Sequence, residues 1–488
     1  MTLRALLLLA ATTWVAANSW AQAPLSIDPS FNFQVTPAYP AEWDYTGIIH
    51  ASERSDGTIL VGGPYLNIPD QNNPDGGSFL INHAGDFVPS NFIWVPYSGV
   101  TELVNGQYLA NHQRYNHDGT WDTNWVYQPD TLNRFTRGGW QVFDDLSMLV
   151  GGSFNFEFGE PPMICLIKLR SDGQLDTTWP VRHCDPYRQM FEMFPLTNGQ
   201  YLVRGNWDNY EGQPTGPFVR INADGSPDLS FQFDAFRGNV NAVHELENGK
   251  LIMGGRFFMN NQLDTLNLVR LNVDGSLDPS FNNYGNYRIN VSPVSDLLGT
   301  VNVVSKLDEE RFVVGGVFTT VNGEPRSSIS CVDTLGNLLG CWAGGGLMPT
   351  SVQPGGFPIM GLAGFKQFSN GDWYMYGQYK GFVDDSGEHP DQVVMSRLYG
   401  PAVGLEERKA PTTLRIWPNP GMDQVQLHWP GHAQFIVTFH DAVGRSVLKE
   451  RVSNGSYAAE VAQLASGMYS VQVVAATGER TSTKWTKP

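Results

Sequence analysis

Residues 240–282 read VNAVHELENGKLIMGGRFFMNNQLDTLNLVRLNVDGSLDPSFN and carry the clearest pattern in this chain of 488 residues. Short apolar runs alternate with polar residues at a period of two, which is the signature of β-strands. The dipeptides Asn248-Gly249 and Asp274-Gly275 supply the positive φ that tight reversals require. We therefore expect four short antiparallel strands here, at VNAV (240–243), KLIMGG (250–255), LNLVRLN (266–272) and SLDPSF (276–281).

Weaker copies of this unit recur along the chain, at intervals of roughly 40 to 60 residues. The end of the apolar second strand aligns at Gly62, Asn111, Gly151, Arg204, Gly254, Gly315 and Tyr376. The aromatic residue that closes the fourth strand aligns at Phe92, Trp125, Trp179, Phe231, Phe281 and Trp342. The alignment predicts seven copies of one four-stranded unit.

The seventh copy lacks its fourth strand, and a matching piece lies at the other end of the repeats. SRLYG (396–400) fits a third strand, whereas IDPSF (27–31) matches LDPSF (277–281) and stands alone before the first copy. A displaced strand of this kind can close a ring and so remove the open sheet edges. An open solenoid would instead need capping units. We therefore predict an all-β chain with a seven-bladed β-propeller over residues 22–403, closed by the N-terminal strand.

The first residues predict a route of export. MTLRALLLLAATTWVAANSWAQAPLS combines one Arg, an apolar run and small residues, which is typical of a secretory signal peptide. We assign this peptide to residues 1–21, with cleavage after Ala21, because cleavage after Ala23 would place Pro24 directly behind the cut. No later apolar stretch reaches the length of a membrane span, so we do not expect an integral membrane protein.

Charge is distributed unevenly along the chain. The formal net charge is −17, and the acidic excess lies entirely before residue 411. An acidic surface disfavours nucleic acid and anionic membranes as partners. Solubility is the simplest interpretation of this charge.

Four cysteines in an exported chain favour disulfide bonds over thiol chemistry. Cys331 and Cys341 flank Gly336 symmetrically, which predicts a bridge across the hairpin between the third and fourth strands of the sixth copy. Cys165 and Cys184 flank the equivalent turn of the third copy less symmetrically, so their pairing is a second, weaker hypothesis. Buried free cysteines are the alternative.

The composition changes again near residue 404. We expect a short polar linker at residues 404–412. Residues 413–488 then alternate apolar and polar positions between turns that contain Asp, Gly and Ser. This pattern predicts a small C-terminal β-sandwich.

This C-terminal segment resembles the C-terminal sorting domain of the type IX secretion system, through IWPNP (416–420), DAVGRSV (441–447), LASGMYSVQV (464–473) and two terminal lysines. The family usually has Tyr at the position of Trp417. The matching residues are Trp417, Pro418, Asn419, Pro420, Asp441, Gly444, Gly467, Tyr469, Lys484 and Lys487. The resemblance implies export through the periplasm of a Gram-negative bacterium, the type IX machinery as a partner, and either release or attachment at the cell surface.

The repeats resemble the delta-60 repeat family of β-propellers, through VNAV (240–243), KLIMGG (250–255), LVRLNVDGSLDPSFN (268–282) and NADGSPDLSF (222–231). Asn111 and Arg204 depart from this family because they replace an expected Gly. The resemblance implies a propeller architecture and adds little on mechanism.

No linear motif for a nucleophile elbow, a zinc-binding helix, a phosphate loop or paired carboxylates occurs, so we predict no catalytic residue, metal or cofactor. Acidic turns such as NADGSPD (222–228) resemble calcium loops but lack the closing Glu, and a hairpin turn explains them. Residues 381–392 form a second acidic cluster, which we interpret as a solvated loop and not as a metal site. Its titratable residues are Asp384, Asp385, Glu388, His389 and Asp391.

Aromatic side chains are abundant and allow two interpretations. Packing between the sheets of the blades is favoured, and a sugar-binding platform is the alternative. The residues in question are Trp43, Trp94, Trp140, Trp207 and Trp373.

Two functions fit these features. The favoured one is an exported, non-enzymatic propeller that binds a protein or polysaccharide through the loops of one face. The alternative is a secreted hydrolase or lyase acting on glycans or peptides, with acid and base on separate blades around the central channel. Two carboxylates, or a His and a carboxylate, within reaction distance at the channel mouth would favour the alternative.

Processing after Ala21 is open to a direct measurement. N-terminal sequencing of the exported protein should begin at Gln22. A chain that begins at Pro24, or one that retains residues 1–21, would contradict the assigned cleavage site.

Overall fold

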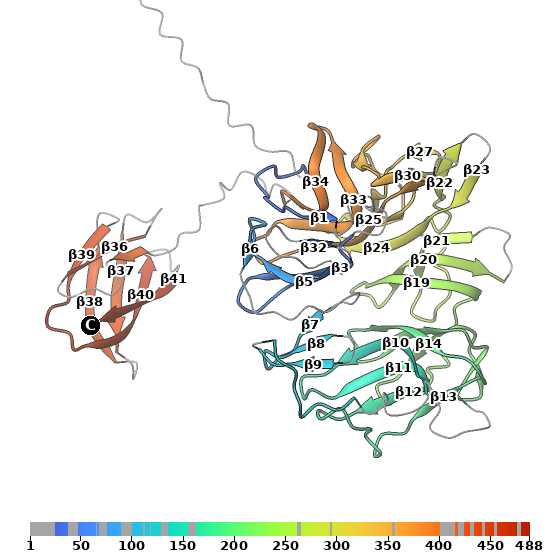
Figure 1. Ribbon diagram of the computed structural model, residues 1–488, viewed down its shortest axis with the longest axis horizontal. Coiled ribbons are helices and arrows are strands. Elements are labelled where there is room, and N and C mark those ends of the chain that lie inside the picture. Colours follow the sequence, from blue (N-terminus) through green and yellow to red (C-terminus); the bar gives the residue numbers. More distant parts are fainter. Residues whose placement is uncertain are drawn as a thin grey trace, which may run out of the picture. The chain divides into compact units, whose positions relative to one another are not determined.

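The chain divides into two compact units, residues 1–401 and 402–488, in a computed structural model (Figure 1). The structure describes residues 25–37, 47–64, 66–67, 76–88, 100–110, 113–117, 119–127, 135–154, 163–260, 265–292, 295–353, 357–400, 415–417, 424–429, 434–441, 445–452, 456–475 and 480–488. Every regular element within these ranges is a β-strand. The predicted all-β class is confirmed.

Within these ranges, small antiparallel sheets follow the sequence repeats through the first unit. The first two are β2 (His50–Glu53), β3 (Ile59–Pro64), β5 (Gly76–Ile81) and β6 (Phe87–Val88), and β7 (Val100–Glu102), β8 (Tyr108–Ala110) and β9 (Gln113–Tyr115). The third holds β10 (Phe135–Val142), β11 (Met148–Phe154), β12 (Met163–Leu169) and β13 (Arg182–Cys184), and the fourth holds β14 (Met190–Pro195), β15 (Tyr201–Gly205) and β18 (Phe218–Ile221).

The later repeats continue this order. The fifth sheet holds β19 (Ala235–Glu245), β20 (Leu251–Met259) and β21 (Thr265–Leu271), the sixth β24 (Thr300–Lys306), β25 (Arg311–Val317) and β28 (Ile329–Asp333), and the seventh β32 (Gly361–Gln367), β33 (Trp373–Asp384) and β34 (Gly387–Leu398). Strand β32 contacts β24 and β25 on one side and β2 on the other. In Figure 1 the blue strands β3 and β5 accordingly lie beside the orange β32.

The tight turns are the ones that the sequence predicts. Gly249 has φ +77° and Gly275 has φ +84°, a region that residues with a Cβ rarely adopt. Each Asx side chain before the turn glycine accepts the backbone N–H two residues further on, as Asp274 does from Ser276 at 3.0 Å.

The second-strand glycines allow neighbouring sheets to approach. A Cβ on Gly254 would lie 2.5 Å from Val301 of the next sheet, and Gly151 and Gly315 meet Met190 and Leu362 in the same way. The close approach therefore explains why the repeat uses Gly here. At Arg204, which departs from the pattern, the guanidinium instead reaches Asn239 of the next sheet at 2.9 Å.

The fourth strands are shorter than the sequence predicts. In the second to sixth sheets this segment forms one isolated bridge to the third strand, for example Leu271 to Leu277, and then turns, whereas β6 of the first sheet pairs with β5 over two residues. The turn arises because the Asp278 carboxylate accepts both the N–H and the hydroxyl of Ser280, at 2.9 and 2.7 Å. In the SLDPSF motif the polar residues thus make a turn and the final Phe281 packs in the core.

A buried arginine connects successive sheets through a recurring set of contacts, which we call the arginine joint. Arg270 donates to the Asp278 carboxylate at 2.8 Å and to the carbonyl of Thr334, in the next sheet's turn, at 2.5 Å. Its guanidinium also lies over the ring of Phe281, 4.9 Å from the centroid. The same arrangement recurs as Arg114 with Asp122, Ser171 and Trp125, and as Arg220 with Asp228, Val273 and Phe231.

The two ends of the repeats form this joint as well. Arg397 donates to the Asp28 carboxylate at 2.6 Å and to the carbonyl of His83, and it lies over Phe31. Ile27 bridges Leu398, in the register of Leu277 with Leu271. The N-terminal segment therefore occupies the fourth-strand position of the seventh sheet.

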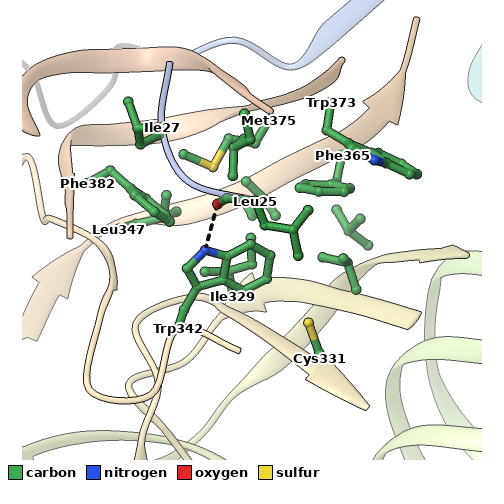
Figure 2. Packing of buried hydrophobic residues seen from close by; sticks show 14 of the residues in the cluster. Leu25, Ile27, Ile329, Cys331, Trp342, Leu347, Phe365, Trp373, Met375 and Phe382 are labelled. Atoms are coloured by element: carbon green, nitrogen blue, oxygen red, sulfur yellow. Dashed lines mark hydrogen bonds between the residues drawn. The ribbon is translucent and has the colours of Figure 1, made fainter. Parts of the chain in front are cut away.

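The N-terminal segment is also packed into the core. Figure 2 shows Leu25 and Ile27 among side chains of the sixth and seventh repeats, including Trp342, Phe382 and Met375. The indole N–H of Trp342 donates to the Leu25 carbonyl at 3.4 Å, and the N–H of Ile27 donates to the Asp384 carboxylate at 2.9 Å.

A glutamate joint lies at the same end of the sheets as the arginine joint, because Glu245 faces Leu251 and Leu251 faces Leu271, the neighbour of Arg270. Glu102 and Glu245, at the ends of first strands, accept backbone N–H groups from the turns of the preceding sheets, at Ser55 (3.1 Å) and Thr197 (2.6 Å). Glu53 of the first sheet accepts from Ser369 of the seventh at 2.7 Å. The junction between the seventh and first sheets thus repeats the chemistry of internal junctions.

Two of the four cysteines form a disulfide bond, and the other two are free thiols. Cys331 and Cys341 form the predicted disulfide, with a Cα–Cα distance of 5.6 Å. Cys165 and Cys184 are not joined, and both are buried. The register shifts at Cys165, because Ile164 faces His183 while Leu166 faces Arg182. Cys165 therefore lies in a bulge and is not directly opposite Cys184, which corrects the second pairing hypothesis.

The second unit contains two antiparallel sheets around one core. Its sheets are β35 (Arg415–Trp417), β36 (Gln424–His428) and β39 (Ser456–Glu460), and β38 (Ser446–Val452), β37 (Phe435–His440), β40 (Gly467–Ala475) and β41 (Arg480–Lys487). Trp429, Phe439 and Trp485 are among the buried residues that the two sheets share.

The arginine joints predict acid sensitivity. Burial acts to raise the pKa of Asp228, but hydrogen bonds from Ser230 and Arg220 outweigh it and lower the pKa to about 2. A lowered folded-state pKa stabilises the fold above the ordinary pKa of the carboxyl, 3.8, and this stability is lost as the pH falls toward 2. Asp228→Asn should therefore cost about 1.5 to 3 kcal/mol at pH 7, the usual worth of hydrogen bonds to a charged group.

Circular dichroism of urea unfolding at pH 7 and at pH 3 tests this expectation. The cost of Asp228→Asn should shrink at pH 3. The matched control is Asp172→Asn, whose partner Arg170 is exposed, and an exposed pair contributes little. Equal costs for the two variants at pH 7 would contradict a structural role for the joint.

Candidate functional site

The predicted processing and sorting residues are only partly within the described ranges. Ala21, Pro418, Asn419, Pro420 and Gly444 lie outside them. Trp417 is the last residue of β35, and its backbone pairs with Gln426.

The remaining sorting-motif residues lie in or next to the strands β37, β40 and β41 of the second unit. Asp441 accepts the N–H of Arg445 at 2.9 Å and so connects the end of β37 with the start of β38. Gly467 begins β40 at φ +151°, and Tyr469 is buried against Trp485. Lys487 donates to the carbonyls of Val461 and Ala462, both at 2.6 Å.

Lys484 differs from its neighbours because it is exposed on β41, opposite Ser470. The sorting-motif residues described here thus range from the buried Tyr469 to the exposed Lys484.

The acidic cluster at residues 381–392 is solvated at Asp385, Glu388 and Asp391, as expected, but it is a strand hairpin and not a loop. It forms the outer part of the β33–β34 hairpin, and the side chain of Asp384 is only 4% exposed. Burial acts to raise the pKa of Asp384, but hydrogen bonds from Ser386, Ile27 and His389 outweigh it and lower the pKa. Asp384 thus holds the N-terminal segment, a role that the sequence did not reveal.

Three His–carboxylate contacts occur among the described residues, and each carboxylate also has a structural role as a hydrogen-bond acceptor for the backbone. His83 lies 3.0 Å from Glu53, His389 lies 3.0 Å from Asp384, and His183 lies 3.4 Å from Glu211. In every case the carboxylate also accepts a backbone N–H, from Ser369, Ile27 and His183 respectively. Within the described ranges no group of three or more His, Cys, Asp or Glu side chains has the arrangement of a metal site.

The described tryptophans that we considered as a sugar-binding platform lie in or against the hydrophobic core. Trp207 and Trp373 are buried, and Trp140 packs against the core of the third sheet. Trp43 and Trp94 lie outside the described residues.

Extra strands gather at the end of the blades that carries the connections between second and third strands. Hairpin β16 (Asn209–Tyr210) and β17 (Gln213–Pro214) extends the third sheet beyond β13. Hairpin β26 (Thr320–Val321) and β27 (Glu324–Pro325) pairs with β22 (Tyr287–Ser292), whose other partner is β23 (Ser295–Leu298).

The same docking recurs around the unit. Strand β4 (Leu66–Asn67) pairs with β1 (Thr36–Pro37), and the outer part of β33 pairs with β29 (Gly346–Leu347), while β30 (Ser351–Gln353) and β31 (Phe357–Ile359) form a further hairpin. In each docked case the chain between the second and third strands reaches the segment that follows the preceding fourth strand. We call the surface formed by β1, β4, β13, β16–β17, β22–β23, β26–β27, β29–β31 and the outer β33–β34 hairpin the hairpin face.

The hairpin face contains an open pocket of about 520 Å³. It lies where β13 meets the β16–β17 hairpin. Its lining residues are His183, Cys184, Asp185, Pro186, Asn209, Glu211 and Gly212.

Carboxylates fix the walls of this pocket. Asp185 accepts the N–H groups of Asp208 and Asn209, both at 2.8 Å, and the Asn209 side chain at 3.1 Å. Glu211 accepts the N–H of His183 at 2.5 Å and Arg182 at 3.2 Å. Burial acts to raise the pKa of Asp185, and the backbone hydrogen bonds outweigh it and lower the pKa, so this carboxylate is ionised at neutral pH.

Sequence reasoning did not find this pocket. Its residues come from HCDPYR (183–188) and NYEGQ (209–213), which fall between the repeated strands and share no period with them. The available signal was an insertion: the fourth repeat is longer between its second and third strands than a tight turn requires.

Two further titratable side chains with shifted pKa values, Glu192 and His50, lie on first strands. Burial raises the pKa of Glu192 on β14, and Arg204, 3.3 Å away, opposes this rise only in part. On β2, burial and the neighbouring Lys366 lower the pKa of His50 to about 4. A carboxyl group with a raised pKa can act as a general acid, so Glu192 is the residue through which an enzymatic function would be tested.

Two family models match the chain. The β-propeller domain of unknown function DUF5122 matches residues 147–178, 196–231 and 246–281. The secretion system C-terminal sorting domain matches residues 415–487. The chain therefore carries DUF5122 β-propeller repeats followed by a type IX secretion sorting domain, and both predicted resemblances are confirmed.

The sorting domain indicates secretion or an outer cell-surface location, as predicted. Among the described residues, no helix has the length and apolar character that crossing a bilayer requires. No curated protein matches the chain.

Solved structures of bacterial surface proteins are distantly similar. The extracellular domain of BT4673 from B. thetaiotaomicron has 10% identity and a TM-score of 0.41, with 95% of this chain and 60% of that chain covered. PorZ from Porphyromonas gingivalis, described as an essential surface component of the type IX secretion system, has 12% identity and a TM-score of 0.27, with 90% and 51% covered. The chain thus spans about half to three fifths of the length of these proteins.

Proposed function

We propose that this protein is an exported, non-enzymatic propeller that binds a protein or polysaccharide at the bacterial surface through its hairpin face. The sorting domain supplies delivery through the type IX machinery. The repeats supply a rigid support, and the extra hairpins supply a surface that differs from blade to blade. No cofactor or metal is part of this function.

The proposed organisation has four parts: a signal peptide at residues 1–21, a seven-bladed propeller at 22–403, a linker at 404–412 and a sorting sandwich at 413–488. The propeller is a closed ring in which residues 25–31 complete the last blade. The support for this ring is the joint of Arg397 with Asp28, which has the same partners as the internal joint of Arg270 with Asp278.

The observation that carries the function is the position of the inserted hairpins. At the turn face, which holds the connections between first and second strands, the loops are short Asx-Gly turns such as Asn248-Gly249. At the hairpin face, the β16–β17 and β26–β27 hairpins dock on β13 and β22. Variable segments on a fixed scaffold are the usual place for ligand binding.

The alternative, a secreted hydrolase or lyase with its site in the central channel, has one observation in its favour. Glu192 is a carboxyl group with a raised pKa on a first strand. Its closest charged partner is Arg204, which supplies neither a second carboxylate nor a general base. We therefore retain this function as the second candidate.

A face-masking experiment tests the proposal. Gly323, at the tip of β26–β27, and Gly249, at the turn face, both have positive φ and little surrounding them. Each would be changed to Cys and coupled to a 5-kDa polyethylene glycol. Binding to polysaccharide and protein fractions of the producing bacterium's surface is then measured by biolayer interferometry.

The Gly323→Cys conjugate should lose at least tenfold in affinity, and the Gly249→Cys conjugate should bind like the unmodified protein. Released reducing ends and new amino groups are assayed in the same fractions. Turnover that Glu192→Gln abolishes would replace the binding function with the enzymatic one. Equal loss of binding in both conjugates, or no binding to either fraction, would also contradict the proposal.

A further inference from the structure

The pocket between β13 and the β16–β17 hairpin has a geometry that is fixed before any ligand arrives. Glu211 and Gly212 turn the hairpin at φ +51° and +68°, and the N–H of Glu211 donates to the His183 carbonyl at 2.8 Å. The Glu211 carboxylate returns to the N–H of the same His183. The backbone and the side chain of Glu211 thus both hold the hairpin tip on β13 through hydrogen bonds to His183.

The opposite wall is clamped in a similar way. Asp185 follows β13 directly, and its carboxylate accepts three N–H groups from residues 208 and 209 at the start of the hairpin. Tyr210, on the hairpin, is fully buried and donates to the Gly225 carbonyl at 2.9 Å. A preorganised wall of this kind loses little conformational entropy when it binds a ligand.

An exposed aromatic residue directly follows two residues that line this pocket. Tyr187 is 86% exposed and has φ +60°, which is unusual for a residue with a Cβ. Its turn is closed by the N–H of Arg188, which donates to the carbonyl of Asp185 at 3.2 Å. The two residues before Tyr187, Asp185 and Pro186, line the pocket. Residues held in sparsely populated backbone conformations cluster at functional sites, including ligand contacts.

The chemistry of the lining favours one class of ligand. The volume of about 520 Å³ is in the range of small-molecule sites, which hold a few fixed polar groups. The Asp185 and Glu211 charges are already compensated by N–H donors and by Arg182, so a cation gains little from them. Their remaining lone pairs suit neutral hydroxyl donors, and the acidic chain disfavours anionic polymers.

We propose that this pocket binds a neutral saccharide unit, with Asp185, Asn209 and Glu211 accepting or donating to its hydroxyls and Tyr187 stacking on its C–H face. The assignment rests on the proposed binding function and names its ligand class and its site. Tyr and similar aromatics suit this role because one face is apolar while the hydroxyl stays in water.

The test uses the full exported chain and defined probes. Binding is measured by isothermal titration calorimetry to neutral cello-, xylo- and manno-hexaose, to hexagalacturonate and to heptalysine. The variants are Tyr187→Ala and Asp185→Asn. Tyr284→Ala is the matched control, because Tyr284 is also exposed, at 59%, but is not adjacent in sequence to any residue that lines the pocket. Melting temperatures establish that each variant is folded.

At least one neutral hexaose should bind, Tyr187→Ala should weaken it at least tenfold without lowering the melting temperature, and Tyr284→Ala should change it less than twofold. Binding of hexagalacturonate or heptalysine alone would overturn the assignment, as would neutral binding that Tyr187→Ala leaves intact. Absence of neutral binding would overturn it too. If the hairpin face still captures surface material in that case, the binding function stands and only this pocket assignment fails.

Discussion

The first unit depends on a buried arginine that belongs to two sheets at once. Arg270 satisfies Asp278 in its own sheet and the Thr334 carbonyl in the next, and its flat guanidinium covers Phe281. Each sheet is too small to bury both of its faces alone. An arginine that binds the turn of the next sheet therefore fixes the angle between the two sheets. Apolar packing alone would define this angle less sharply. Arg suits this position better than Lys because its planar guanidinium can donate hydrogen bonds to several acceptors while it stacks on an aromatic ring.

The same joint links residues from opposite ends of the unit. Asp28 and Arg397 meet with the geometry of an internal joint, and Glu53 and Ser369 repeat the internal glutamate joint beside them. Closing so long a segment adds only a modest entropic cost, because that cost grows with the logarithm of its length. In the proposed ring, these contacts would hold the hairpins of the binding face in a fixed arrangement relative to one another.

The sequence predicted the architecture where residues repeat and missed it where they do not. IDPSF at residues 27–31 matched LDPSF because the Asp, Ser and Phe each have a physical task in the joint. The arginine partner was visible in VRLN and SRLYG but was not recognised, because a lone Arg in a strand carries no signal without its spatial neighbours. Most fourth strands are shorter than the sequence pattern predicted. The hydrogen bond from Ser280 to the Asp278 side chain turns the backbone and ends the pairing. The pocket and the role of Asp384 were not predictable, because both join segments without a common period.

The central claim is that residues 25–31 complete the last blade of a closed ring. Ile27 and Leu398 form a non-hydrogen-bonded antiparallel pair, with the N–H of Asp28 donating to Arg397 and that of Tyr399 donating to Ser26. Such pairs have the Cα spacing that a disulfide needs. The double variant Ile27→Cys with Leu398→Cys, analysed by peptide mapping under non-reducing conditions, should therefore form an intramolecular bond as completely as Leu271→Cys with Leu277→Cys, an internal pair in the same register. If the internal pair forms its bond while the cysteine introduced in place of Ile27 stays reduced, or bonds only to a second molecule, the ring is not closed by its N-terminal strand.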